Sequence, residues 1–481
     1  MRILQILFAG TCLVFFGANH ANSQQRPNIL LITVDDMNCD SVGVYGCPVD
    51  DVTPNIDRLA AEGMRFEHAH VTIAICQPTR AVWMTGRYPH RNGALGFDPI
   101  RPDVPTLLET LHDAGYYTGI MGKVPHVVPT RKAAWDMIVS ADDLDIGRNP
   151  KLYGKKAAKF LQDAAEADKP FFLMANSQDP HRPFAGSDQE RNRKLVRPAQ
   201  RFPGVRRTYK PNEVPVPGFL PDVPEVKKEM AEYYTSVHRA DEIVGALLAS
   251  LNASGKANET IVMFLSDHGM PLPFAKTNCY RHSTKTPWIV RWPDRVATNS
   301  VNSQRMISGI DLAPTLLDLV GLPSLLGADG TSFAPTLLEQ AESPTGDQQY
   351  VFTYINRTSG RNEYPMRSVQ DKRYGYIFNG WANGQTEFKN ESQSGRTMAA
   401  MRRIAEKDEV VRDRVALFLY RTPEEFYDYQ NDPDALYNLS DSPEHAELVQ
   451  QFRLVLLEHM TQTDDPALAS FQNWLETHVL R

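Results

Sequence analysis

The stretch that decides the fold is Asn28-Ile29-Leu30-Leu31-Ile32-Thr33-Val34-Asp35-Asp36. Its near-continuous apolar run is typical of a central strand in a parallel sheet, because such strands are buried on both faces. The run ends in two adjacent carboxylates, which repel each other unless a cation lies between them. Open α/β sheets bind ligands at the carboxyl ends of their strands. The stretch therefore predicts a central strand leading into a cation site, with a plain polar turn as the alternative for the Asp-Asp pair.

Three further apolar runs predict strands of the same sheet, at Tyr117–Met121, Pro170–Asn176 and Thr260–Leu265. Each is followed by polar side chains. Apolar residues at helical spacing predict helices over Pro105–Ala114 and Glu225–Leu251. This alternation predicts an α/β fold with a mixed, mostly parallel sheet flanked by helices.

The pattern changes after the polar stretch Glu339–Gln349. Shorter alternating segments, such as Tyr350–Ile355 and Tyr374–Asn379, predict strands of a second sheet. We therefore expect a large domain over residues 24–340 and a smaller C-terminal α+β subdomain, containing an antiparallel sheet, over residues 341–481.

The N-terminus has the features of a secretory signal peptide over residues 1–23. Arg2 precedes the apolar run Ile3–Ala18, and Ala21-Asn22-Ser23 offers a small-residue cleavage site. The run is too short for a membrane span, and no later run is long enough for one. The sequence therefore predicts an exported, soluble protein in a periplasmic, secreted or lysosome-like compartment.

Composition agrees with a globular protein, since 42% of the 481 residues are hydrophobic and 9% are aromatic. A formal net charge of −7 without a basic stripe argues against nucleic acid as a partner. An anionic substrate needs only local arginines and lysines. The four cysteines beyond the signal peptide, Cys39, Cys47, Cys76 and Cys279, are too few for a disulfide scaffold. The sequence leaves open whether Cys39 and Cys47 form a disulfide, and it leaves the oligomeric state open.

A second informative stretch is Cys76-Gln77-Pro78-Thr79-Arg80, followed by Thr85-Gly86-Arg87. Pro78 suits the first turn of a helix, where its missing N–H costs nothing. Cys76 would then lie at the positive end of that helix, which favours negative charge. Arg80 would lie about one turn along the same face. A lone cysteine is more often a buried apolar residue, so the interpretation depends on partners elsewhere in the chain.

Together with the acidic residues that end two of the predicted strands, Asp35-Asp36 and Asp267, the stretch resembles the signature of type I sulfatases. In that family the cysteine is oxidised by the formylglycine-generating enzyme to formylglycine, whose hydrate attacks sulfur. The resemblance covers nearly the whole mature chain and implies an alkaline-phosphatase-like fold, a sulfated carbohydrate substrate and a role in glycosaminoglycan degradation. The segments Phe274–Tyr280 and Tyr364–Gln370 are most similar to those of sulfamidases, the heparan N-sulfatases.

The resemblance also implies one Ca²⁺ per chain. Its ligands would be Asp35, Asp36, residue 76 as formylglycine, Asp267 and His268. Three hard carboxylates suit calcium better than zinc. His268 is a weaker calcium ligand than the asparagine found in other members, and it could instead bond to the formylglycine or the sulfate.

The catalytic residues implied by the resemblance are Cys76, Arg80, Lys123, His126, His181 and Lys276. Calcium, Arg80 and Lys123 would neutralise the sulfate and lower the pKa of one hydroxyl of the hydrated aldehyde, which attacks sulfur. Lys276 or His181 would protonate the departing oxygen or nitrogen. His126 would take a proton from the second hydroxyl, which expels sulfate and restores the aldehyde.

The chain departs from the family pattern at Gln77 and at two further points. One extra residue separates Lys123 from His126, a spacing that resembles iduronate-2-sulfatases, and Gln178 replaces the first histidine of a His-x-Pro-His motif that retains His181.

The favoured function is an N-sulfoglucosamine sulfohydrolase. The alternatives are a glycan O-sulfatase, a phosphoric ester hydrolase, which Cys76 argues against, and a non-catalytic glycan-binding protein with Cys76 unmodified. The exact sugar, the sulfate position and endo or exo action stay open.

Overall fold

The computed structural model describes residues 26–127, 132–197, 199–339 and 348–478. The predicted signal peptide at residues 1–23 lies outside the described residues, and so does the predicted domain boundary at residues 340 and 341. Within the described ranges, no helix is both long enough and apolar enough to cross a membrane. Cys39 and Cys47 are both free thiols in the structure.

The main sheet has eight strands in the order β5-β4-β6-β1-β7-β8-β2-β9. Their bounds are β1 Asn28–Asp35, β2 Met64–Phe66, β4 Tyr117–Met121, β5 Met137–Val139, β6 Phe171–Pro180, β7 Thr260–Ser266, β8 Trp288–Arg291 and β9 Ser300–Asn302. The central strand β1 runs parallel to both β6 and β7. Strand β8 is antiparallel to both of its neighbours. The predicted mixed, mostly parallel sheet is therefore confirmed.

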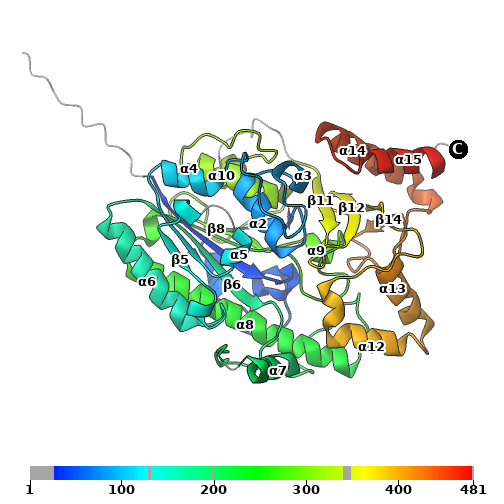
Figure 1. Ribbon diagram of the computed structural model, residues 1–481, viewed down its shortest axis with the longest axis horizontal. Helices are drawn as coiled ribbons and strands as arrows, with labels where there is room; N and C mark the ends of the chain where they lie inside the picture. The colour runs from blue at the N-terminus through cyan, green and yellow to red at the C-terminus, as the bar shows by residue number, and fades with distance from the viewer. Residues whose placement is uncertain (1–25, 128–131, 198, 340–347, 479–481) are drawn as a thin grey trace, which may run out of the picture.

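Helices cover both faces of this sheet (Figure 1). Leu30 and Ile32 of β1 pack in one core cluster with α6 Pro150–Glu166 and α8 Pro224–Ala253. Ile29 and Leu31 pack on the other face with α2 Cys76–Thr85, α4 Leu107–Asp113 and α10 Leu312–Leu319. This alternation follows from the two-residue period of a strand, and it explains why β1 reads as continuously apolar. The helices of this region are α1 Pro54–Ala61, α2 Cys76–Thr85, α3 Pro89–Asn92, α4 Leu107–Asp113, α5 Val124–Val127, α6 Pro150–Glu166, α7 Asp188–Val196, α8 Pro224–Ala253, α9 Arg281–Thr284, α10 Leu312–Leu319 and α11 Ala334–Leu337.

A second, antiparallel sheet lies at the C-terminal side of the molecule, at the right of Figure 1. It consists of β11 Val351–Arg357, β12 Glu363–Gln370, β13 Tyr374–Asn379 and β14 Glu424–Asp428. Helices α14 Ala446–Gln462 and α15 Leu468–His478 share a separate core cluster with it. Two more helices, α12 Arg396–Ile404 and α13 Glu409–Tyr420, precede β14. The predicted antiparallel sheet of the C-terminal region is therefore confirmed.

The C-terminal sheet is hydrogen-bonded to the segment that follows a small third sheet. That small sheet is the parallel pair β3 Ala69–His70 and β10 Ile307–Ser308. The backbone N–H of Tyr354 in β11 donates to the carbonyl of Thr72 at 2.8 Å. Residues that follow the small sheet can therefore reach the carboxyl ends of the main strands.

Candidate active site

The two carboxylates at the end of β1 enter one buried cluster. In a regular strand, neighbouring side chains point to opposite faces. Asp36 instead has a φ of 68°, in the left-handed region, which ends the strand. Oxygens of both Asp35 and Asp36 lie within 4.8 Å of Cys76 Sγ and of a ring nitrogen of His268. The local backbone therefore turns two adjacent carboxylates toward the same point.

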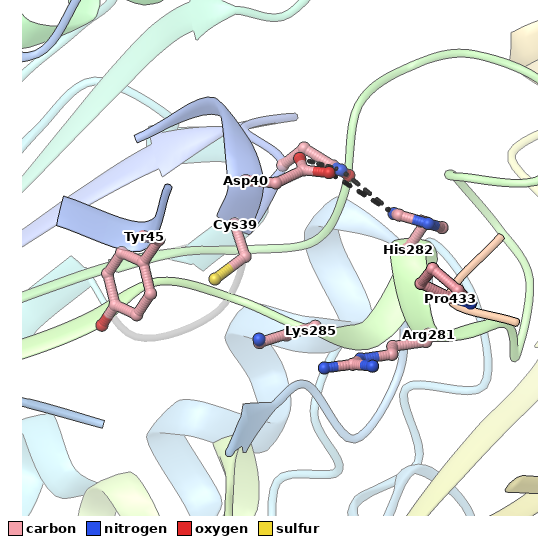
Figure 2. A pocket seen from close by; sticks show the side chains of 8 residues that line it. Cys39, Asp40, Tyr45, Arg281, His282, Lys285 and Pro433 are labelled. Atoms are coloured by element: carbon pink, nitrogen blue, oxygen red, sulfur yellow. Dashed lines mark hydrogen bonds and ion pairs between the residues drawn. The ribbon is translucent and has the colours of Figure 1, made fainter. Parts of the chain in front are cut away.

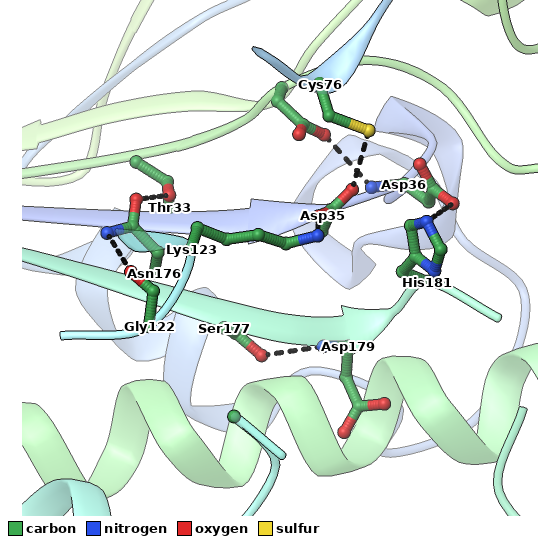
Figure 3. A network of polar contacts seen from close by, with 12 residues as sticks. Thr33, Asp35, Asp36, Cys76, Gly122, Lys123, Asn176, Ser177, Asp179 and His181 are labelled. Carbon is green, nitrogen blue, oxygen red and sulfur yellow. Dashed lines mark hydrogen bonds and ion pairs between the residues drawn. The ribbon is translucent and has the colours of Figure 1, made fainter. Parts of the chain in front are cut away.

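Cys76 is the first residue of α2, and its sulfur faces the end of β1 (Figure 3). The sulfur lies 3.5 Å from Asp35 Oδ1 and 3.4 Å from His268 Nε2. Burial raises the pKa of the Cys76 thiol well above its usual value, and Asp267 and Asp36 add to this, whereas Lys276 opposes it. Because the thiolate is the nucleophilic form, an unmodified Cys76 is a poor nucleophile here.

Arg80 lies one turn along the same helix and is fully buried. Its Nη2 is 3.0 Å from Asp267 Oδ2, and its Nη1 donates to Thr33 Oγ1 at 2.9 Å and to Asn176 Oδ1 at 2.6 Å. Burial alone would raise the pKa of Asp267, but His268, Arg80 and Lys123 outweigh it and hold that pKa below its usual value. The guanidinium group is thus fixed from three strands, β1, β6 and the end of β7.

Two lysines from separate segments meet the Asp35-Asp36 pair. Lys123, just after β4, forms an ion pair with Asp35 Oδ2 (Figure 3), and Lys276 Nζ lies 2.9 Å from Asp36 Oδ1. Burial lowers the pKa of Lys123 to about 7. Burial also disfavours the charge on Lys276, but Asp36, Cys76 and Glu391 outweigh it and raise the pKa of that ammonium group. The structure therefore brings both predicted lysines into the cluster.

The two predicted histidines are held differently. His181, in the loop after β6, has its Nε2 4.0 Å from Asp36 Oδ2, and burial lowers its pKa to about 4. His126 lies in α5, and burial, reinforced by Lys123 and Arg80, lowers its pKa to about 2. Among the residues that the structure describes, its buried Nδ1 has no hydrogen-bond partner. His181 is therefore in contact with the cluster, whereas the His126 ring packs edge-on against Phe97, with 5.6 Å between the ring centroids.

The donor set fits a hard divalent cation. In the described part of the chain, neither Asp35 Oδ2 nor Asp36 Oδ1 accepts a hydrogen bond of regular geometry, although lysine ammonium groups pair with both. Buried carboxylates without hydrogen bonds are expected to be paired or to coordinate metal. The predicted ligand Asp267 is placed differently from the other four. Its Oδ2 pairs with Arg80, and its Oδ1 accepts a hydrogen bond from the Asp36 N–H at 3.1 Å. The same Oδ1 lies 3.7 Å from His268 Nε2.

Glu391 is a site residue that the sequence did not reveal. It begins a 3-10 turn, Glu391–Ser394, after β13. Its Oε2 lies 2.9 Å from Lys276 Nζ, and its Oε1 lies 3.2 Å from His181 Nε2. It follows a polar loop rather than an apolar strand, so no local pattern marked it.

Asp179 forms a second buried group beside the cluster. It pairs with Arg148 and with Arg239, whose Nε lies 2.6 Å from Asp179 Oδ2. Arg148 Nη2 also donates to the carbonyl oxygen of His181 at 2.9 Å. This group therefore positions the loop that carries His181.

A separate cavity of about 180 Å³ lies near the same strand end but does not contain the cluster (Figure 2). It is lined by Asn38, Cys39, Asp40, Tyr45, Arg281, His282, Lys285 and Pro433. None of the predicted site residues lines it, and its cysteine is Cys39.

Two protein families match this chain. The family described as "Sulfatase" matches residues 27–322, and the one described as "N-sulphoglucosamine sulphohydrolase, C-terminal" matches residues 267–413. The N-sulphoglucosamine sulphohydrolase of Homo sapiens is 31% identical, over 94% of this chain and 93% of its own. An ulvan-active sulfatase of Formosa agariphila is 26% identical, over 92% of this chain and 76% of its own.

Among solved structures, a protein in complex with its substrate D-glucosamine-2-N,6-O-disulfate aligns with a TM-score of 0.68. That alignment covers 92% of this chain and 99% of the other at 19% sequence identity. At this sequence identity the structural similarity shows only that the two proteins share a fold. The family membership of the chain is shown by the family match and by the human relative.

Proposed function

The chain belongs to the sulfatase family and is a sulfohydrolase, and from this premise we propose that it removes sulfate from a sulfated glycan, with N-sulfoglucosamine as its preferred substrate. The observation that carries the proposal is the convergence of Asp35, Asp36, Cys76 and His268 within 4.8 Å at the end of β1. The substrate assignment is supported by the human relative, because the similarity extends through the C-terminal region as well as the main sheet.

We propose that Cys76 is converted to formylglycine by the formylglycine-generating enzyme. The position of Cys76 at the start of α2, with its sulfur 3.5 Å from Asp35 Oδ1, supports this, because an aldehyde hydrate formed there would lie against the proposed calcium ligands. A hydrated aldehyde supplies two hydroxyls on one carbon, one to attack sulfur and one to expel sulfate. Export through residues 1–23 would place the enzyme where extracellular or lysosomal glycans are degraded.

The same residues would hold Ca²⁺. Asp35, Asp36, residue 76 and His268 supply the ligand atoms, and Asp267 is the neighbouring carboxylate. When bound, the ion supplies Lewis-acid charge to the sulfate and to the attacking oxygen. The chain itself supplies three buried basic side chains, Arg80, Lys123 and Lys276, which would bind the sulfate oxygens.

Proton transfer falls to three side chains. Lys276 and His181 lie on the Asp36 side of the cluster and are joined through Glu391, so they are placed to donate a proton to the leaving atom. We assign proton uptake in the second step to His126, whose buried Nδ1 has no hydrogen-bond partner among the described residues.

A substrate panel tests the proposal. Protein coexpressed with the formylglycine-generating enzyme is incubated with N-sulfoglucosamine, glucosamine-6-sulfate and a 2-O-sulfated uronate disaccharide, and released sulfate is measured. We expect release from N-sulfoglucosamine. Release from the O-sulfated sugars alone would replace the assignment with a glycan O-sulfatase. Binding of the sugars without any release by fully converted protein would indicate a glycan-binding homologue.

Removal of calcium should abolish sulfate release and lower the melting temperature. A ligand present at 100 times its Kd stabilises the folded state by about 2.7 kcal/mol, and chelation removes that contribution. The measurements are sulfate release and thermal unfolding after dialysis against EGTA, followed by addition of Ca²⁺. Asp36→Asn should fail to bind calcium in a calorimetric titration, whereas the exposed Asp40→Asn serves as the matched control. Full activity in metal-free protein would contradict the calcium site.

A further inference from the structure

Glu391 adds a negative charge at the partly exposed edge of the buried cluster. Its side chain is 31% exposed, whereas the side chain of its partner Lys276 is 2% exposed. It contacts Lys276 and His181, at 2.9 Å and 3.2 Å, and so joins the two groups assigned to the leaving atom. Glu391 therefore lies on the open, leaving-group side of the cluster.

The position of Glu391 is fixed by its neighbours. The Asn390 amide donates to the carbonyl oxygen of Lys276 at 3.0 Å, and Ser392 Oγ donates to Asn390 Oδ1 at 2.8 Å. The turn that carries Glu391 is thus tied to the loop that carries Lys276. Burial would raise the pKa of Glu391, but Lys276 and His181 outweigh it and keep the carboxyl ionised.

An ionised carboxylate at this place weakens sulfate binding by charge repulsion. That cost is offset if the substrate presents a hydrogen-bond donor or a positive charge to it. A sulfamate nitrogen carries a hydrogen, whereas the bridging oxygen of a sulfate ester carries none. Hydrolysis of R–NH–SO₃⁻ by water yields R–NH₃⁺ and SO₄²⁻, so the product also carries a positive charge at the former leaving atom.

We propose that Glu391 is a specificity-determining residue that accepts a hydrogen bond from the leaving nitrogen of an N-sulfated amino sugar. The inference rests on the proposed function and deepens it, because it explains how the site separates N-sulfates from O-sulfates. An O-sulfate would place a lone pair against the carboxylate, and this repulsion, in the place of the hydrogen bond from a sulfamate N–H, penalises the wrong ligand.

The test compares two substrates in Glu391→Gln, which keeps the shape of the side chain and removes its charge. We expect kcat/KM on N-sulfoglucosamine to fall about 10- to 100-fold, the range for a hydrogen bond to a charged group. On 4-nitrophenyl sulfate, whose leaving oxygen carries no hydrogen, we expect a loss at least about threefold smaller, caused only by the disturbed contacts of Lys276 and His181. Glu387→Gln is the matched control, because Glu387 forms a looser ion pair with Arg402 at 3.4 Å.

Product inhibition gives a second readout that does not depend on the aryl sulfate. Glucosamine carries an amine at the position of the leaving nitrogen, whereas N-acetylglucosamine carries no charge there. We expect Glu391→Gln to weaken inhibition by glucosamine about tenfold, as for the loss of one charged hydrogen bond, and to weaken inhibition by N-acetylglucosamine, whose amide N–H is an uncharged donor, by less than this. If Glu391→Gln does not fold, Glu391→Asp, which withdraws the carboxylate, should show the same selective loss.

The outcomes separate the two claims. Wild-type protein that cleaves only O-sulfated sugars overturns the proposed substrate. Wild-type protein that cleaves N-sulfoglucosamine, with equal losses on both substrates and both inhibitors in Glu391→Gln, overturns this inference alone. In that case Glu391 acts only by holding Lys276 and His181.

Discussion

Replacing Cys76 with alanine is expected to lower the rate of sulfate release about 10⁴-fold or more, the scale seen when a catalytic nucleophile is removed. Alanine has no sulfur to oxidise, so no hydrated aldehyde forms at the end of β1. The carboxylates, Arg80 and both lysines stay in place, so substrate binding should change far less than turnover. Sulfate release under saturating substrate measures the effect.

The matched control for Cys76→Ala is Cys39→Ala. Cys39 is also a buried free cysteine near the end of β1, but it lines the separate cavity of Figure 2. We expect Cys39→Ala to retain activity within a few-fold of the wild type, with the roughly 1 kcal/mol loss of stability that is typical of a single substitution. Substantial turnover in Cys76→Ala would show that another group attacks sulfur.

Replacing Asp179 with asparagine should destabilise the protein by about 3–5 kcal/mol, the range for leaving a buried charge unpaired. Arg148 and Arg239 are both buried, and both pair with Asp179. Without its charge, two buried guanidinium groups lose the carboxylate that they share. The free energy of unfolding from chemical denaturation measures the loss.

The same substitution should also disturb catalysis, because Arg148 donates to the backbone carbonyl of His181. Asp188→Asn is the matched control, since Asp188 pairs with arginines at the exposed surface of α7, and we expect it to leave the denaturation midpoint unchanged. If Asp179→Asn and Asp188→Asn have similar free energies of unfolding, the ion pairs of Asp179 with Arg148 and Arg239 do not stabilise the fold.

The architecture could be predicted because single segments encode it. Strand β1 is buried on both faces, so its sequence is continuously apolar, and the same holds for β7. The site residues that follow such strands, Asp35, Asp36, Lys123 and Asp267, were marked by their position at the strand ends. The helix start at Cys76 was marked by Pro78 and by the spacing to Arg80.

The rest depends on contacts between segments that are distant in sequence. Glu391 reaches the cluster only because the C-terminal region packs against the main sheet, and a glutamate in a polar loop carries no signal of that. The pairing of Asp267 with Arg80 is also a property of the folded core. Sequence placed Asp267 among the ligands but could not show how its two oxygens are shared.

The account depends most directly on the chemical state of residue 76. That state is measured on protein that releases sulfate, by mass spectrometry of the tryptic peptide that contains residue 76 and ends at Arg80. We predict the mass of an aldehyde or its hydrate at residue 76, in a fraction that rises in proportion to the specific activity. A fully active sample in which residue 76 is entirely a thiol would contradict the account.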